Sequence, residues 1–409
     1  MKIFAFIVLG LVIAASGGGV FAEEAATATS APAAQESGVT LTSPKEWEIF
    51  QRTSPTEGRL RIEGRVGGLQ GRPLHLLMSV KPGESSGVPS STRIADMADV
   101  TSGKDGTFEV EMKVPAGGWH VLLVAVSEMD RNLGQAVVEH VGVGEVFVVG
   151  GQSNSTNWGE ARTRTDTGMV TVFDGKEWTV AADPIPGVDA GQGKGSPWCL
   201  FGDDMYAKLH VPIGIVPVGK GSTSVRQWLP KGDVVEIEPT RTDGLKKNPD
   251  GKWVNDGTLY DRMVERMKQL DEANGGGHGF RAMLWHQGES DAHQPEGHTL
   301  PGKDYRAMLE RVIKESRKEV GWEVPWFVAT ATWGSPESPI DPDIRAAQHG
   351  VVEDGVAMQG PDTDTLIGAN RQKHGTGVHM SLKGLYAHAG LWANIVGPWV
   401  TVQQGIQNK

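Results

Sequence analysis

A serine follows two glycines directly after an apolar segment of the chain. Residues 146–149 (VFVV) are typical of a strand buried on both faces, and residues 150–154 (GGQSN) come next. A strand that ends in glycines can turn sharply and present the Ser153 hydroxyl at the carboxyl edge of a parallel sheet, where open α/β folds bind ligands. The backbone N–H groups there could stabilise an oxyanion. The alternative for this motif alone is a turn with a capping serine.

Two further segments offer groups that acyl transfer needs. Residues 219–228 (GKGSTSVRQW) follow another apolar run, and a backbone N–H near Gly221 or Ser222 could be a second oxyanion donor. Residues 285–291 (WHQGESD) hold the Gln287 amide, which could donate to the same oxyanion. They also hold Glu289, whose carboxylate could fix the tautomer of a histidine.

The imidazole that would take the serine proton is expected near the C-terminus. His379 stands at a junction between a loop and a helix-like run, from which a ring can reach over the sheet edge. His374 and His388 compete for this role. Together, the four motifs supply a nucleophile, oxyanion donors, a carboxylate and a base, in loops near strand ends or helix starts.

A metal site is the alternative for one of these motifs. His286, Glu289, Asp291 and His293 are types that bind metal, but their spacing matches no recognised ligand pattern. The spacing therefore argues against a metal at this motif.

Composition and the N-terminus limit the partners and the location. The 409 residues carry a net charge of -11, and basic clusters such as Lys246-Lys247 are short, which argues against a nucleic-acid partner. Residues 1–22 have the charge, apolar run and small-residue cleavage site of a secretory signal peptide, and no later segment is apolar enough to cross a membrane. We expect an exported protein, periplasmic or extracellular, with no membrane contact after cleavage.

The remaining chain divides by its patterning. Residues 23–40 are rich in Ala, Thr, Ser and Pro and indicate a disordered tether. Residues 41–142 alternate apolar and polar side chains, which predicts a small β-sandwich. From 143 to 403 short apolar runs alternate with helical spacing, as at 259–270 and 305–313, which predicts an α/β fold with a parallel sheet. A polar insertion at 229–255 interrupts this region.

At these motifs the sequence resembles the sialate O-acetylesterase family and its relatives in carbohydrate esterase family six, within the SGNH hydrolase superfamily. The matching pieces include GQSN at 151–154, GST at 221–223, WHQGES at 285–290 and VHMS at 378–381. The resemblance implies a three-layer α/β/α flavodoxin-like domain. It also implies Ser153 as nucleophile, His379 as base, and an oxyanion hole made by Ser153, Gly221 and Gln287. It implies neither a metal nor an organic cofactor.

One departure from the family pattern concerns the acidic partner of the histidine. Many members have an aspartate three residues before it, where this chain has Thr376. Because some relatives are thought to use the glutamate of the Gln-Gly-Glu motif, we assign the role to Glu289. Asp362 and Asp364 remain substitutes.

The expected function is removal of acetyl or other short acyl esters from carbohydrate. Candidate substrate contacts are Gln152, Asn154, Arg226 and Trp228. One alternative is a general short-chain arylesterase, since the sequence does not settle acyl length. The other is a catalytically inactive carbohydrate-binding protein, which only Thr376 supports.

Overall fold

The computed structural model describes residues 38–82, 93–187, 189 and 194–405. The chain is a mixed α/β protein with one large sheet of eleven strands and two smaller sheets of three. The expected signal peptide and the expected tether up to residue 37 lie outside the described residues. Among the helices described, none combines the length and apolar character that crossing a bilayer requires.

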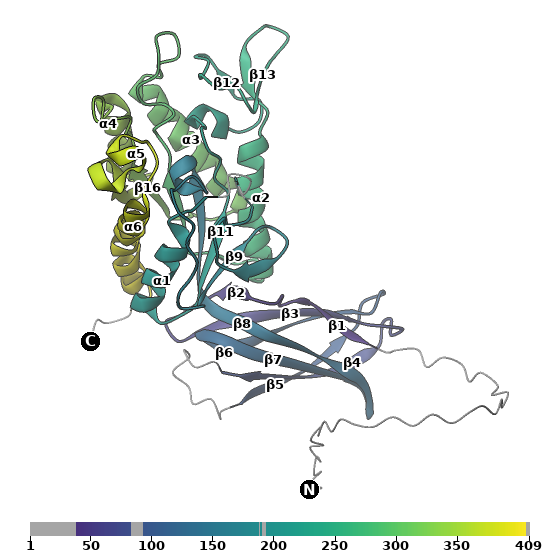
Figure 1. The fold of residues 1–409 in the computed structure, drawn as a ribbon. Coiled ribbons are helices and arrows are strands. Elements are labelled where there is room, and N and C mark those ends of the chain that lie inside the picture. Colours follow the sequence, from purple (N-terminus) through teal and green to yellow (C-terminus); the bar gives the residue numbers. More distant parts are fainter. Residues whose placement is uncertain (1–37, 83–92, 188, 190–193, 406–409) are drawn as a thin grey trace, which may run out of the picture. The chain divides into compact units, whose positions relative to one another are not determined.

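Strands that are antiparallel, except for one parallel pair, make up the first part of the described chain (Figure 1). The predicted alternation is confirmed: Leu60 and Ile62 of one strand are buried, and so are Phe108 and Met112 of its partner. In this part, side chains of one three-stranded sheet and of the antiparallel strands of the large sheet share one buried cluster. The strands are β1 (Val39–Ser43), β2 (Glu48–Gln51), β3 (Glu57–Val66), β4 (Pro73–Lys81), β5 (Ile94–Thr101), β6 (Thr107–Pro115) and β7 (Gly117–Glu128).

The longest strand, β8 (Arg131–Gly151), belongs to both parts of the large sheet. Its first half pairs with β7 and its middle with β2. From Glu145 onward it lies between two parallel strands, β11 (Ile213–Pro217) and β15 (Ala282–His286). The boundary expected between residues 142 and 143 therefore falls inside a continuous strand.

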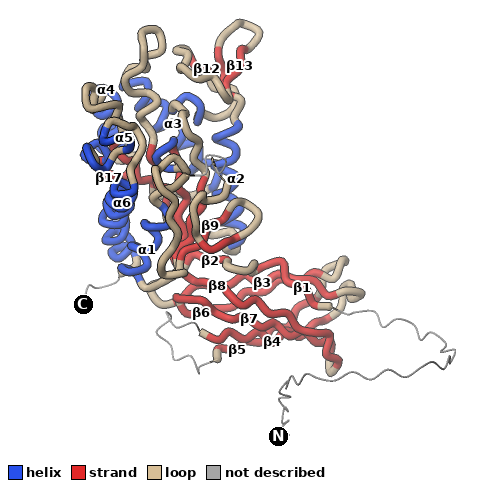
Figure 2. Tube along the Cα trace, in the orientation of Figure 1, coloured by secondary structure: helices blue, strands red, loops and turns tan. Residues whose placement is uncertain are grey.

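The second part of the sheet has the order β10-β9-β11-β8-β15-β16-β17, in which all neighbours are parallel except the antiparallel pair of β9 and β10. Figure 2 shows helices beside the strands of this part. The chain leaves β8 to build strands on one side and later returns to build strands on the other. The crevice at such a change of direction, at the carboxyl ends of the strands, is where open α/β sheets bind ligands. The outer strands are β9 (Val170–Phe173), β10 (Trp178–Val180), β16 (Trp326–Thr330) and β17 (Met358–Asp362).

Helices pack against alternate side chains of these strands. Phe147 and Val149 of β8 share a buried cluster with α1 and α6, whereas Val146 and Val148 share another with α2, α3 and α4. The helices predicted at 259–270 and 305–313 are confirmed within α2 and α3. The helices are α1 (Trp198–Leu209), α2 (Thr258–Ala273), α3 (Gly302–Val320), α4 (Pro342–Glu353), α5 (Gln372–Gly375) and α6 (Leu382–Gln403).

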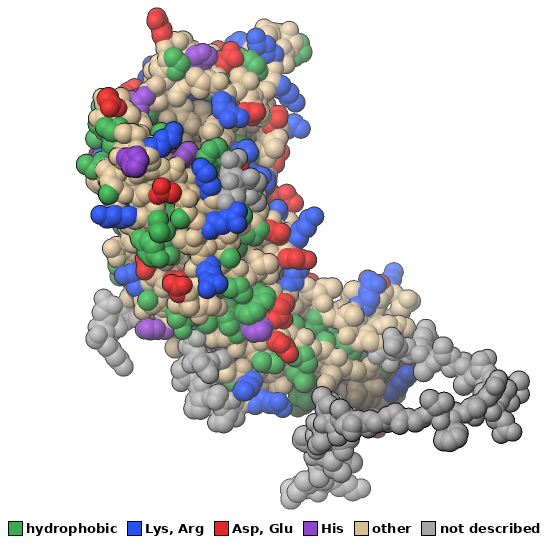
Figure 3. All heavy atoms as spheres, in the orientation of Figure 1, with side chains coloured by type: hydrophobic (Ala, Val, Ile, Leu, Met, Phe, Trp, Pro, Cys, Tyr) green, Lys and Arg blue, Asp and Glu red, His purple; other side chains and the backbone are tan. Residues whose placement is uncertain are grey.

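The polar insertion folds into a small antiparallel sheet of its own. It consists of β12 (Val234–Val235), β14 (Trp253–Asn255) and β13 (Leu245–Lys247), in that spatial order. The space-filling view shows acidic and basic side chains interspersed over the visible face of the molecule (Figure 3).

A buried ion cluster lies where β8 exchanges its neighbours. The Glu145 carboxylate accepts hydrogen bonds from Arg52 Nε at 2.7 Å, Arg281 Nε at 2.7 Å and Gln51 Nε2 at 2.9 Å. The side chains of Arg52 and Glu145 are essentially inaccessible to solvent. Two guanidinium groups thus depend on one carboxylate for their charge balance.

We expect Glu145→Gln to lower the free energy of unfolding by about 3–5 kcal/mol, because it leaves buried guanidinium charge without a counterion. Urea unfolding measures this. The matched control is Glu111→Gln, which removes the exposed pair with Arg59 and should cost less than about 1 kcal/mol. Equal losses in the two variants would contradict the expectation.

Candidate active site

The Ser153 turn is made possible by a close main-chain approach. Gly151 has φ of +116°, and a β-carbon placed on it would lie 1.9 Å from the carbonyl oxygen of His286 in the neighbouring strand. Only glycine fits this position without displacement of the backbone. A short 3-10 helix (Ser153–Ser155) follows, and Ser155 donates to the Gln152 carbonyl through both its N–H at 2.8 Å and its hydroxyl at 2.7 Å.

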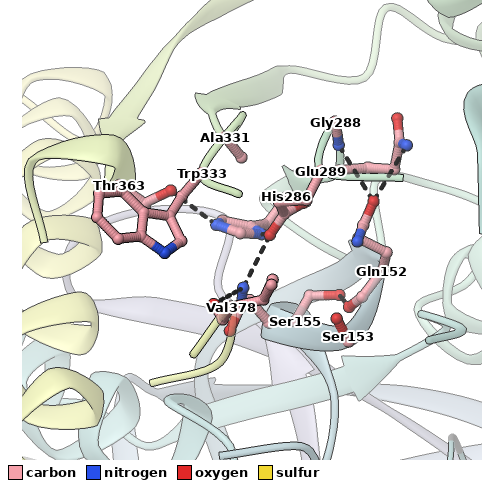
Figure 4. Close-up of polar contacts among 12 residues, drawn as sticks. Gln152, Ser153, Ser155, His286, Gly288, Glu289, Ala331, Trp333, Thr363 and Val378 are labelled. Carbon is pink, nitrogen blue, oxygen red and sulfur yellow. Dashed lines mark hydrogen bonds and ion pairs between the residues drawn. The ribbon is translucent and has the colours of Figure 1, made fainter. Parts of the chain in front are cut away.

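The Gln152 side chain joins this turn to the loop that follows β15 (Figure 4). Its Oε1 accepts hydrogen bonds from the Ser290 N–H at 2.9 Å and the Gly288 N–H at 3.4 Å. Gln152, a predicted substrate contact, also lines the adjoining cavity. It therefore fixes two of the four motifs relative to each other.

Ser153, Glu289 and His379 come from three distant stretches of chain and line one cavity of about 300 Å³. Within the described part of the chain, no hydrogen bond joins Ser153 to His379 or Glu289 to His379. The cavity is lined by Gln152, Ser153, Ser222, Ser224, Gln227, Pro239, Thr240, Arg241, Glu289, Ser290, Gln294, Val378 and His379.

His379 is held as a neutral imidazole. Its ring lies 5.1 Å from the ring of Trp158, centroid to centroid. Burial, together with the positive charges of Lys194, Arg371 and Lys373, lowers the pKa of His379 to about 4. At neutral pH the ring is therefore unprotonated and can accept a proton.

Glu289 lines the cavity and also belongs to a buried polar group (Figure 4). Its Oε1 accepts a hydrogen bond from Asn154 Nδ2 at 2.8 Å and stands 3.7 Å from Nδ1 of His286. His286 Nε2 lies 2.9 Å from the hydroxyl of Thr363, which itself donates to the Thr330 carbonyl at 2.9 Å. Burial raises the pKa of Glu289 to about 7, so both its protonation states are accessible near neutrality.

The substitute acids have partners of their own. Asp362 pairs with Arg345. Asp364 accepts from the N–H and hydroxyl of Thr332, at 2.7 and 2.6 Å, and also from Arg345. Thr376 is exposed, and its hydroxyl donates to a carbonyl within its own loop. Of the three acids considered, Glu289 is the one that lines the cavity.

The Gln287 amide points into a buried network instead of lining the cavity. Its Nε2 donates to Asp291 Oδ2 at 2.7 Å and to the Thr223 carbonyl at 3.1 Å. Asp291 also accepts from the Ser224 hydroxyl at 2.5 Å and the Val225 N–H at 2.9 Å. Sequence reasoning considered Asp291 only as a metal ligand and missed this organising position.

Of the two residues expected to supply a second oxyanion donor, Gly221 is already engaged. The Gly221 N–H donates to Asp189 Oδ2, which accepts from the indole N–H of Trp158 at 3.3 Å as well. The next residue, Ser222, has φ of +60° and lines the cavity. Among the described residues, none accepts a hydrogen bond from the backbone N–H of Ser153 or of Ser222. These two N–H groups are the better candidates for an oxyanion.

Arg226 and Trp228, predicted to contact substrate, are buried and are not among the cavity-lining residues. Arg226 pairs with Asp291 and donates to main-chain carbonyls, while Trp228 donates to Thr223 and packs edge-on against Trp285. Asn154, the remaining predicted contact, instead holds Glu289.

The alternative metal ligands do not gather around a common point. His293 contacts the Thr332 carbonyl and the Ser338 hydroxyl, away from the partners of His286 and Asp291. In the part of the chain that the structure describes, no group of three His, Cys, Asp or Glu side chains is arranged to hold a metal ion.

A serine at the end of a central parallel strand thus shares its cavity with an imidazole and a carboxyl group, a set of groups suited to acyl transfer. The model of one family, described as carbohydrate esterase, sialic acid-specific acetylesterase, matches residues 143–384, which is more than half of the chain. The chain belongs to this family and is a carboxylic ester hydrolase, as the motifs predict.

One solved structure shares the fold at a TM-score above 0.5, and two others match with lower scores. A carbohydrate acetylesterase from Xanthomonas citri is 18% identical with a TM-score of 0.52, over 87% of this chain and 74% of that one. A protein from Arabidopsis thaliana is 20% identical with a TM-score of 0.43, over 62% of this chain and 98% of that one. A family two carbohydrate esterase from Clostridium thermocellum is 10% identical with a TM-score of 0.35, over 86% and 90%. No curated protein matches the sequence.

We expect Gly151→Ala to lower the free energy of unfolding by about 3 kcal/mol and to reduce ester hydrolysis, because the added methyl group must push β8 away from the His286 carbonyl. Thermal unfolding and a p-nitrophenyl acetate assay measure the two effects. Gly67→Ala is the matched control, since a β-carbon there meets no atom within 4 Å. A Gly151→Ala protein as stable as the Gly67→Ala protein would disprove the steric argument.

Proposed function

We propose that this esterase removes O-acetyl groups from carbohydrate, with Ser153 as nucleophile and His379 as base. The observation that carries the proposal is the single cavity lined by Ser153, His379 and Glu289. The family to which the chain belongs supports an acetylated carbohydrate as substrate. No metal or organic cofactor enters the proposed reaction.

In the proposed reaction, the Ser153 oxygen attacks the acetyl carbonyl carbon while His379 takes the hydroxyl proton. The negative oxygen of the tetrahedral intermediate accepts hydrogen bonds from the N–H groups of Ser153 and Ser222. The intermediate collapses, the bond to the sugar oxygen breaks, and His379 returns its proton to that oxygen. Water, deprotonated by His379, then attacks the acetyl-enzyme. The bond to the Ser153 oxygen breaks, His379 returns the proton to that oxygen, and acetate leaves.

Glu289 is proposed as the acidic partner of the base. An ionised carboxylate beside the cavity favours the imidazolium that forms on His379 during each half-reaction. Asn154 supports the ionised form of Glu289, because its amide N–H donates a hydrogen bond to a carboxylate oxygen and cannot accept one from a protonated carboxyl. We do not assign this role to Asp362 or Asp364, because both are bound to Arg345.

The finer description of the fold belongs to the same proposal. We infer a three-layer α/β/α arrangement of the SGNH type over residues 143–403, preceded by a β-sandwich over 41–142. Two helix groups that pack with alternate side chains of β8 support the three layers. We also propose export, to the periplasm or the medium, on the sequence of residues 1–22.

We expect Ser153→Ala to lower kcat on p-nitrophenyl acetate and on an acetylated sugar by about three to six decades, because the attacking oxygen is removed. Acetate release measures the loss. Ser127→Ala, on β7, is the control and should retain activity. Equal acetate release by the wild-type and Ser153→Ala proteins would reject the proposal, as would failure of Ser153 to react with a fluorophosphonate probe.

The pH profile tests the role of Glu289. Burial raises the pKa of Glu289 to about 7, so the carboxyl is neutral below that pH and charged above it. If the charged form is needed, kcat/KM should rise with pH through about 7. In Glu289→Gln the rate should fall, and the acid limb should move down towards the pKa of His379, which is about 4. If the acid limb stays in place in Glu289→Gln, the ionisation belongs to another group, and the role proposed for Glu289 is wrong.

A further inference from the structure

The polar insertion at 229–255 supplies part of the wall of the cavity that holds Ser153. Pro239, Thr240 and Arg241 line the cavity, although no step of the proposed reaction uses them. Gln294, from the loop after β15, completes this side of the wall, and the Thr240 hydroxyl donates to its Oε1 at 3.0 Å. We call these four residues the insertion wall.

Buried donors fix the insertion wall on both sides of Thr240. Arg226 Nη1 donates to the carbonyl of Ile237 at 2.9 Å, and Gln227 Nε2 donates to the carbonyl of Asp243 at 2.6 Å. Both donors belong to the segment that also contributes Ser222 and Ser224 to the cavity. The main chain of the wall is therefore tied to the same structure that presents the candidate oxyanion donor.

The exposed chemistry of the insertion wall fits a sugar. Thr240 offers a hydroxyl and Gln294 a carboxamide, and each can both donate and accept a hydrogen bond. Arg241 adds guanidinium donors, but Asp243 lies 3.0 Å from its Nη2 and balances its charge. A wall of donors and acceptors without a free charge matches the hydroxyl groups of an uncharged ring better than it matches a carboxylate.

We propose that the insertion wall is a subsite for the uncharged, polyhydroxylated sugar that carries the acetyl ester. This inference rests on the proposed function, because the ester must reach Ser153 while the sugar contacts Thr240, Arg241 and Gln294. The insertion then determines which alcohol the enzyme accepts, while the four motifs carry out the chemistry.

The test compares a sugar ester with an ester that lacks the sugar. For each protein, kcat/KM is measured on monoacetylated xylobiose and on p-nitrophenyl acetate, and the ratio of the two is taken. Thr240→Val and Arg241→Gln should each lower this ratio about fivefold, and the double variant about twentyfold, as expected for the loss of one and two hydrogen bonds. Lys246→Gln, in exposed β13 of the same insertion, is the control and should keep the ratio within about twofold.

A second measurement keeps the subsite testable if a variant folds poorly or the ester assay fails. Unacetylated xylobiose is titrated into Ser153→Ala by calorimetry, and adding Thr240→Val should weaken binding about fivefold. A double variant with a wild-type ratio, or xylobiose binding that is unchanged by Thr240→Val, would overturn the subsite. A wild-type enzyme that cleaves p-nitrophenyl acetate but not monoacetylated xylobiose would also overturn it. Hydrolysis by Ser153→Ala, in contrast, would count against the proposed function.

Discussion

The contact between Gly151 and the backbone of His286 is the constraint on which the rest of the site depends. Two parallel strands approach so closely that a methyl group at position 151 would overlap the neighbouring carbonyl. That approach brings the loop after β8 beside the loop after β15, and Gln152 then joins them through its side-chain oxygen. Main-chain geometry thus positions the loops that carry the candidate nucleophile and the candidate acid.

Behind the cavity, polar side chains support one another instead of facing the substrate. Asp291 gathers Ser224, Arg226 and Gln287, and each of these donors would be costly to bury without it. This network fixes the segment 219–228, which contributes both a cavity wall and an anchor for the insertion. Much of the polar content of the motifs thus maintains geometry, and a smaller part is left to contact a ligand.

The sequence predicted elements whose side chains repeat with a clear period. The strands around Leu60 and Phe108 and the helices α2 and α3 were expected because one face of each is apolar, and the structure confirms them. Strand β17, with the sequence MQGPD, lacks such a period and was not expected. The sequence also did not reveal that β8 runs from the antiparallel strands into the parallel ones. The residues of a strand do not show where along its length the neighbouring strands change.

For the site, the sequence identified the loops but not the direction of each side chain. Ser153, Glu289 and His379 do line one cavity, whereas Gln287, Arg226 and Trp228 turn into the protein. Residue type alone does not separate these cases, because a buried guanidinium or amide becomes acceptable once an acid such as Asp291 lies nearby. The position of that partner is a tertiary property, and no spacing in the chain reveals it.

The continuity of β8 also bears on how such a protein can change over evolutionary time. One uninterrupted strand pairs with antiparallel strands at its start and with parallel strands at its end. The antiparallel portion is therefore not a separate domain joined by a flexible linker. A recombination event that exchanged it would have to rejoin within a strand, in register, beside a buried carboxylate. Swapping that portion for an unrelated accessory module is therefore a far harder genetic step than lengthening or shortening the insertion at 229–255.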